Sequence, residues 1–275
     1  LRPLADDDGF LDEFYAIKQQ NKVALAKVIK DTLNLVVDPE SIFDVQVKRM
    51  HEYKRQLLLT LYIIMLYNRL VENPGMDIHP RTFIFSGKSA PGYATAKLVI
   101  RLIHGVSELI NNHPSIRKKL TVAFLPDYRV SLAEAIIPAA NLSEQISLAG
   151  TEASGTGNMK LMLNGALTIG TMDGANVEIH EEVGDDNIFI FGLRANDVPT
   201  FRRTYSPLDV YNHDLEIQHV LENIRKNVFS MLTPGIFDPL LRNLLDQGDY
   251  YMHLADLREY ANTQDKVDAL YRKRR

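Results

Sequence analysis

Small, polar and flexible residues gather in the stretch 150–160, which reads GTEASGTGNMK and is called the glycine stretch below. Its three glycines, set among two threonines and a serine, allow backbone N–H groups to converge on an anion. A short helix that began near Gly157 would point its positive end the same way. The glycine stretch therefore predicts a site for a phosphate group.

The glycine stretch matches neither of the common nucleotide-binding patterns. Thr156 stands where the P-loop needs its lysine, and Lys160 stands where the dinucleotide fingerprint needs its third glycine. Between Met159 and Leu161 this lysine is expected to be poorly solvated, which favours a neutral, nucleophilic amine suited to a Schiff base. A buried amine beside a phosphate site suggests pyridoxal phosphate. The alternative interpretation is a flexible connector before a helix with an ordinary solvated lysine.

A second group of chemically active residues, the cationic turn (48–55), follows a predicted strand. It sets Lys48, Arg49, Lys54 and Arg55 against one local acid, Glu52. If this turn faces the glycine stretch, the two segments can hold more than one phosphate-like dianion. A solvated basic turn before a helix is the alternative, because most charge runs are solvated. The position directly after an apolar strand favours a binding site.

The composition excludes several kinds of partner and site. The 275 residues are 45% hydrophobic with a net charge of −4, so the chain can bury a sizeable core and has no basic excess for nucleic acid. The lack of cysteine rules out disulfides and thiolate metal sites and suits a cytoplasmic protein. No stretch predicts a membrane span, and no histidine pattern predicts a metal site. Because the chain begins at Leu1 and ends in RKRR, both ends are expected to be cut.

The elements that must position these residues alternate between strands and helices. Alternation of apolar and polar residues predicts a strand at 42–47, and apolar runs predict strands at 82–87, 120–125, 166–170 and 187–192. Helices are expected at 10–30, 56–71, 93–111, 131–139 and 143–149, the last two capped by their first serines, and from about 197 onward. This alternation indicates a doubly wound, Rossmann-like α/β domain with a mostly parallel sheet. Ligands bind beyond the carboxyl ends of the strands in such sheets.

Four long motifs carry a resemblance to a known family. They are FDVQVKRMHEYKRQL at 43–57, SEQIS at 143–147, EASGTGNMK at 152–160 and GTMDGANVE at 170–178. Together they closely resemble the α-glucan phosphorylases, the family of glycogen, starch and maltodextrin phosphorylases. The resemblance implies the second Rossmann-like domain of a GT-B type glycosyltransferase fold. Residues 1–275 would be the C-terminal pyridoxal-phosphate-binding domain, with a helical part over roughly 197–275, and the N-terminal domain and final C-terminal helices would be absent.

The resemblance also implies roles for individual residues. The cofactor pyridoxal 5′-phosphate would be held by Lys160 as a Schiff base, with its phosphate and ring contacted by Lys48, Tyr128, Arg129, Thr156 and Gly157. The substrate phosphate would be held by Arg49 and Lys54, which with Lys160 would form the catalytic set. The glucosyl hydroxyls would be bound by Glu152, Ala153, Ser154 and Gly155.

A protein of this family would catalyse phosphorolysis. Inorganic phosphate would attack the terminal α-1,4-linked glucose of a glucan and release glucose 1-phosphate with retained configuration. The cofactor's phosphate would act as acid and base, and clustered cations would hold the two phosphates together against their repulsion. The full-length protein would be a homodimer, and this chain alone would be inactive. An aminotransferase-type pyridoxal-phosphate enzyme and a non-catalytic phosphate or nucleotide-sugar binding module stay open as alternatives.

Overall fold

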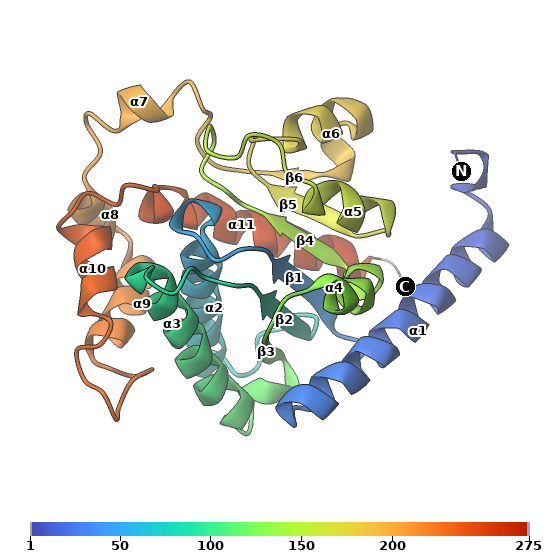
Figure 1. The fold of residues 1–275 in the computed structure, drawn as a ribbon, viewed down its shortest axis with the longest axis horizontal. Coiled ribbons are helices and arrows are strands. Elements are labelled where there is room, and N and C mark those ends of the chain that lie inside the picture. Colours follow the sequence, from blue (N-terminus) through green and yellow to red (C-terminus); the bar gives the residue numbers. More distant parts are fainter. Residues whose placement is uncertain (1, 274–275) are drawn as a thin grey trace.

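A six-stranded sheet forms the centre of the fold in the computed structural model, which describes residues 2–273 (Figure 1). Its strands are β1 (Ile42–Val47), β2 (Arg81–Ser86), β3 (Leu120–Leu125), β4 (Leu142–Gln145), β5 (Leu167–Gly170) and β6 (Phe189–Ile190). All pairings are parallel, and the order in space is β3-β2-β1-β4-β5-β6. The expected doubly wound α/β fold is confirmed, with the strand order reversing between β1 and β4.

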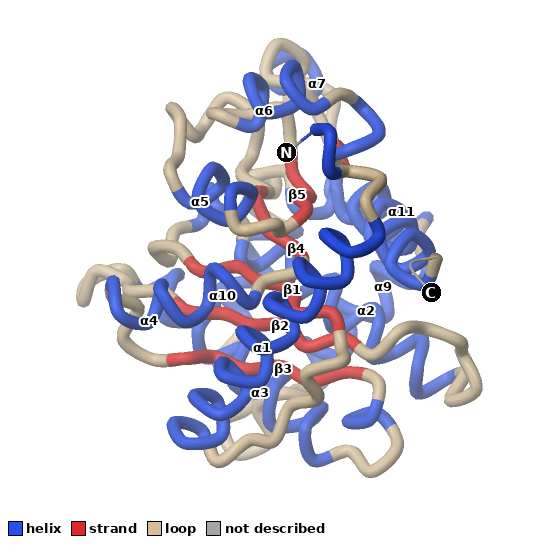
Figure 2. Tube along the Cα trace, turned by 90° about the vertical axis from the view of Figure 1, so that its right-hand side faces the viewer, coloured by secondary structure: helices blue, strands red, loops and turns tan. Residues whose placement is uncertain are grey.

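Helices cover both faces of the sheet. One face is covered by α2 (Gln56–Glu72), α3 (Ala94–Asn112) and α11 (His253–Arg272), and α9 (Leu215–Arg225) and α10 (Asp238–Leu245) pack against these helices in the same hydrophobic cluster. The other face packs against α1 (Asp8–Leu33) and α4 (Val130–Ile136), and Figure 2 shows α1 crossing the strands. Each face has its own hydrophobic core: the first core lies under α2, α3 and α11, and the second core lies under α1 and α4. Successive strand side chains point to the two faces alternately, so Phe83 and Phe85 belong to the first core and Ile84 belongs to the second core.

The shorter elements lie at the ends of the strands and in the C-terminal region. They are α5 (Gly157–Leu163), α6 (Asn176–Val183), α7 (Val198–Phe201), α8 (Pro207–His213) and the 3₁₀ turns η1 (Arg2–Leu4), η2 (Glu52–Lys54), η3 (Ile116–Lys118), η4 (Ile137–Ala139) and η5 (Asp185–Asn187). The region from about 197 is helical, as predicted. Its buried side chains, such as Leu221 and Leu257, belong to the same hydrophobic cluster as α2, α3 and the sheet.

The predicted helix at 143–149 is wrong, because Leu142–Gln145 forms β4 between β1 and β5. This strand has only four residues, of which Leu142 alone is apolar, so it shows neither an apolar run nor the alternation seen in β1. The serine cap at 131 is also wrong, since α4 begins at Val130 and Oγ of Ser131 instead accepts a hydrogen bond from Arg129. The strand predicted at 187–192 shrinks to two residues, and α6 was not expected.

Candidate active site

The cationic turn and the glycine stretch meet beyond the carboxyl ends of β1 and β4. Nζ of Lys48 donates to the carbonyl oxygen of Glu144 at 2.8 Å and to Oε1 of Gln145 at 2.7 Å. The backbone N–H of Leu148 donates to the carbonyl oxygen of Tyr53 at 3.1 Å. These bonds attach the turn after β1 to the segment after β4, so the two groups of residues lie side by side at the switch point of the sheet.

An ion pair between Lys54 and Glu152 closes the contact between the two segments. Nζ of Lys54 also lies 4.6 Å from the ring centre of Tyr53. Burial alone would lower the pKa of Lys54, but its hydrogen bonds to Glu152 and Tyr53 outweigh burial and raise that pKa above its ordinary value. A cation expected to bind phosphate is thus in direct contact with a carboxylate expected to bind sugar.

Lys48 has a different electrostatic environment from that of Lys54. Both partners of its ammonium group are neutral oxygens, and no carboxylate among residues 2–273 pairs with it directly. Burial, followed by repulsion from Lys54, lowers the pKa of Lys48 to about 7. This amine can therefore gain or lose a proton near neutral pH.

The two arginines of the cationic turn have opposite environments. Arg49 is exposed, and its guanidinium has no hydrogen-bond or ion-pair partner within the described residues. Arg55 is fully buried; its Nε donates to the carbonyl oxygen of Ile146 at 2.7 Å, and its Nη1 donates to Oδ2 of Asp256 at 2.6 Å. Arg55 therefore anchors the turn to α11 and does not present a charge to a ligand.

The turn that follows β5 binds the start of the glycine stretch through hydrogen bonds. The carboxylate of Asp173, at the heart of this turn, accepts hydrogen bonds from the segment after β4, namely from N of Gly150, N of Glu152 and Oγ of Ser147. Sequence reasoning assigned no role to Asp173. The available signal was an acid placed directly after a strand within the motif at 170–178.

Lys160 lies on α5, which begins at Gly157 as expected. The prediction that Lys160 is poorly solvated is wrong for this chain, because its side chain is exposed. The reason is the helix geometry: Asn158 and Leu161 form the buried face of α5, and Lys160 lies off that face. Its amine makes no hydrogen bond or ion pair with the rest of residues 2–273.

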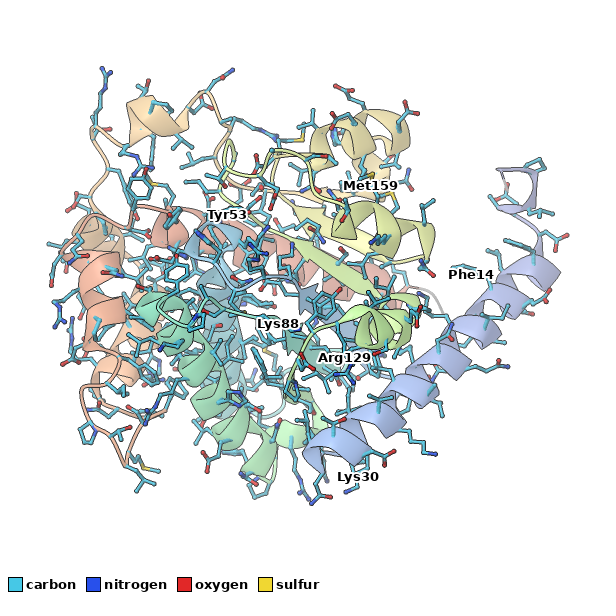
Figure 3. The ribbon with its side chains drawn as sticks, in the orientation of Figure 1. Phe14, Lys30, Tyr53, Lys88, Arg129 and Met159 are labelled. Atoms are coloured by element: carbon cyan, nitrogen blue, oxygen red, sulfur yellow. The ribbon has the colours of Figure 1, made fainter. Side chains whose placement is uncertain are left out.

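Two more predicted residues follow β3. Tyr128 packs against the second core, and burial raises the pKa of its phenol. Arg129 is exposed and is held by Oδ2 of Asp127 and Oγ of Ser131, both at 3.0 Å. Asp127 also pairs with Lys88 at 2.8 Å, and Figure 3 shows Lys88 and Arg129 close together beyond β2 and β3. The structure joins Lys54 directly to Glu152 and brings Lys48 near enough for both to affect its pKa, whereas Arg129 and Lys160 make no hydrogen bond or ion pair with these three residues within 2–273.

The described part of the chain holds neither a candidate metal site nor a candidate membrane-spanning helix. Residues 2–273 contain no group of three or more histidine, aspartate or glutamate side chains placed to hold a metal ion. None of the helices described is both long and apolar enough to cross a membrane.

Comparison with known proteins gives consistent matches along the whole chain. Residues 1–275 match the family model described as carbohydrate phosphorylase. The chain is 52% identical to the glycogen phosphorylase of Chlamydia trachomatis serovar D over 270 residues, which are 98% of this chain and 33% of that protein. It is 50% identical to the glycogen phosphorylase of Synechocystis sp. over 273 residues, which are 99% of this chain and 32% of that protein. It is 48% identical to the muscle form of glycogen phosphorylase from Homo sapiens over 273 residues, which are 99% of this chain and 32% of that protein. The chain thus spans about a third of the length of these relatives.

Proposed function

Because the chain belongs to the carbohydrate phosphorylase family, we propose that it forms the cofactor-binding side of the active site of an α-1,4-glucan phosphorylase. The enzyme uses inorganic phosphate to cleave the terminal α-1,4-linked glucose of glycogen, starch or maltodextrin, and releases glucose 1-phosphate with retained configuration. The contact between Lys54 and Glu152 carries this proposal. This ion pair supports the proposal because Lys54 is the cation that we assign to the attacking phosphate, and Glu152 is the acceptor that we assign to the hydroxyls of the glucose.

The cationic turn binds the inorganic phosphate, and the glycine stretch binds the glucose, in this proposal. The guanidinium of Arg49 has no partner within residues 2–273, so it is available to hold inorganic phosphate together with Lys54. Glu152 accepts from sugar hydroxyls, and the exposed Ala153 and Ser154 continue the sugar-binding segment up to Gly155. When phosphate attracts Lys54, the carboxylate of Glu152 becomes free to accept from the sugar.

The residues around α5 fit pyridoxal phosphate. The amine of Lys160, which is exposed and has no partner among the described residues, suits attachment to an aldehyde. At Gly157 an added Cβ would have no atom within 4 Å, and the hydroxyl of Thr156 makes no cap bond, so a phosphate has open space and donors at the start of α5. Lys48 and Arg129 would supply cations from the ends of β1 and β3, and Tyr128, which follows β3, would contact the cofactor.

Proton transfer and charge balance then fall to named groups. When bound, pyridoxal phosphate would supply a phosphate group for proton exchange with the substrate phosphate. Two dianions held close together repel, since unit charges about 4 Å apart interact by about 4 kcal/mol at an effective dielectric constant of about 20. Lys48, Arg49, Lys54 and Arg129 offset this repulsion, and the pKa of Lys48 near neutrality allows its charge to respond to the protonation of the phosphates.

We propose that a second domain, contributed by the rest of a longer, cytoplasmic and dimeric protein, closes the site over Lys160. The relatives are about three times as long as this chain. Phosphorolysis needs a site that excludes water, because water would otherwise compete with phosphate. The 275-residue chain alone should therefore release no glucose 1-phosphate from a glucan. Detectable release of glucose 1-phosphate by this chain alone would contradict this part of the proposal.

Borohydride reduction of the cofactor-loaded, full-length protein tests the central assignment. Mass spectrometry should find a pyridoxyl adduct on Lys160, the adduct should be lost in Lys160→Ala, and it should persist in the exposed control variant Lys266→Ala. A missing adduct in the unmodified protein would rule out the assignment. Phosphorolysis should survive the reduction, whereas aminotransferase-type chemistry, which uses the cofactor ring, would vanish.

A kinetic comparison tests the phosphate subsite. Arg49→Ala should raise KM for inorganic phosphate more than KM for the glucan, because its guanidinium is expected to touch only phosphate. Equal increases for both substrates would contradict that role. Absence of any glucose 1-phosphate release by the full-length protein would favour a non-catalytic phosphate or nucleotide-sugar binding module.

A further inference from the structure

A single turn after β5, residues 171–176, contacts both the segment expected to bind sugar (152–155) and α5, the helix that carries Lys160. Asp173 in this turn has 5% of its surface exposed. Its Oδ1 accepts from N of Gly150 at 2.8 Å, and its Oδ2 accepts from N of Glu152 at 2.9 Å and from Oγ of Ser147 at 2.6 Å. A buried carboxylate with both oxygens occupied in this way fixes the backbone at Glu152.

The backbone of the same turn supports the next part of the sugar-binding segment. N of Ala175 donates to the carbonyl oxygen of Ser154 at 2.7 Å. Gly174, with φ of +53°, lets the two chains approach so closely that an added Cβ would lie 2.4 Å from that carbonyl oxygen. The segment 147–154 is therefore bound to the turn along its length.

The other end of the turn reaches α5. Asn176 is 2% exposed, and its Nδ2 donates to the carbonyl oxygens of Gln145 and Thr171, both at 3.0 Å. Its Oδ1 accepts from Nδ2 of Asn158 at 3.1 Å. Asn158 is 3% exposed and stands two residues before Lys160 on α5. The bond between the two asparagines is the side-chain link from the turn to the helix that carries Lys160.

We propose that Asp173 and Asn176 are positioning residues with separate tasks. Asp173 sets the position of Glu152 and the sugar-binding segment, and Asn176 acts through Asn158 to set the position of Lys160. Neither side chain reaches the substrate or the cofactor in this assignment. The inference rests on the proposed phosphorylase function and adds to it the claim that sugar binding and cofactor binding can be disturbed independently.

Asp173→Asn changes the hydrogen-bond chemistry with little change in size. An amide has only one acceptor oxygen, so it can keep the two bonds made by Oδ2 but must turn its NH₂ toward the N–H of Gly150. In the full-length protein this variant should raise KM for glucan about tenfold, in line with the loss of one hydrogen bond to a charged group. Its dissociation constant for pyridoxal phosphate should stay within about twofold of that of the unmodified protein. A twofold change is smaller than the change that the loss of one hydrogen bond would produce. The exposed Asp246→Asn is the matched control and should change neither value.

Asn158→Ala removes the link to α5 and leaves the bonds from Asn176 to the ends of β4 and β5 in place. This variant should weaken the binding of pyridoxal phosphate about tenfold and slow formation of the borohydride-trapped adduct at Lys160. With the cofactor in excess, its KM for glucan should return to the unmodified value. The exposed Asn196→Ala is its control.

The opposite pattern of the two variants is the decisive result, because a general loss of stability would move both quantities together. If Asp173→Asn does not fold, Ser147→Ala removes only one of the three bonds to Asp173 and should raise KM for glucan by a smaller factor. The inference is overturned if each variant shifts both quantities in proportion to its loss of thermal stability, or if neither variant shifts either quantity. An unmodified protein without phosphorolysis or without the adduct at Lys160 would instead contradict the proposed function.

Discussion

The buried pair of Arg55 and Asp256 provides the sharpest test of what holds the cationic turn in place. Arg55 is completely buried and Asp256 is 2% exposed, so Asp256→Ala would leave a guanidinium without its counter-charge in a dry interior. Breaking a buried pair from one side costs about 3–5 kcal/mol. Oδ1 of Asp256 also accepts from N of Leu193 at 3.1 Å, and loss of that acceptor leaves a further unpaired donor, which places the expected cost at the upper end of the range.

Urea denaturation followed by far-UV circular dichroism measures this cost. The matched control is Lys88→Ala, which breaks an ion pair whose side chains are 60% and 59% exposed and should cost less than about 1 kcal/mol. The double variant Arg55→Met, Asp256→Ala should lose less than the sum of the two single changes, because no unpaired charge remains. If Asp256→Ala costs no more than Lys88→Ala, the argument that Arg55 anchors the turn through this pair fails.

Three further changes test other parts of the structure. Burial raises the pKa of Asp44 to about 6 and that of its buried neighbour Glu144 well above its usual range. The stability that the Asp44 proton supplies is complete below about pH 4 and is lost as the pH rises through about 6, and the contribution of the Glu144 proton also falls as the pH rises above the usual range of a glutamate. Glu144→Gln should therefore raise stability at pH 7 and flatten urea midpoints measured from pH 4 to 7; an unchanged profile would count against the pair. Gly174→Ala should cost at least about 1 kcal/mol in the same assay and raise KM for glucan, because the new Cβ meets the carbonyl oxygen of Ser154 at positive φ; unchanged values would contradict the close approach. Burial lowers the pKa of Lys48 to about 7, so Lys48 loses charge between pH 6 and 8, whereas the arginine in Lys48→Arg stays charged. The affinity of the apoprotein for pyridoxal phosphate, measured by fluorescence titration, should therefore increase less from pH 6 to pH 8 in the unmodified protein than in Lys48→Arg. Identical pH profiles would show that Lys48 keeps its charge.

The fold was largely predictable because the longer strands carry a local signal: β1 alternates apolar and polar residues, and β3 is mostly apolar. Strands such as β1 and β3 are buried on both faces, so their sequences carry the signal directly. β4 lies in an equally central position, but it is short and its buried Glu144 accepts a hydrogen bond from Gln264 in α11. That partner is 120 residues away, and no local pattern can reveal it.

The site was predictable in its residue types and less so in its geometry. The cations and the glycine stretch lie together as expected, because both follow strands that are neighbours in the sheet. The exposure of Lys160 was predicted wrongly. Its position between two apolar residues suggested a buried side chain, but tertiary contacts decide which face of α5 is buried. Arg55 and Asp173 were misjudged or missed for a similar reason, since their partners come from α11 and from the segment after β4.

The neighbouring positions of β1 and β4 have a consequence for synthesis of the chain on the ribosome. N of Phe43 in β1 donates to Oδ1 of Asn141 at the start of β4, 98 residues later. At about 5–20 residues per second, translation needs about 5–20 s to cover that distance. During this time β1, β2 and β3 have emerged, and one edge of β1 remains open to other nascent chains. Substitutions that weaken β4 should therefore reduce the yield of soluble protein through aggregation during synthesis, before any effect on the finished site is felt.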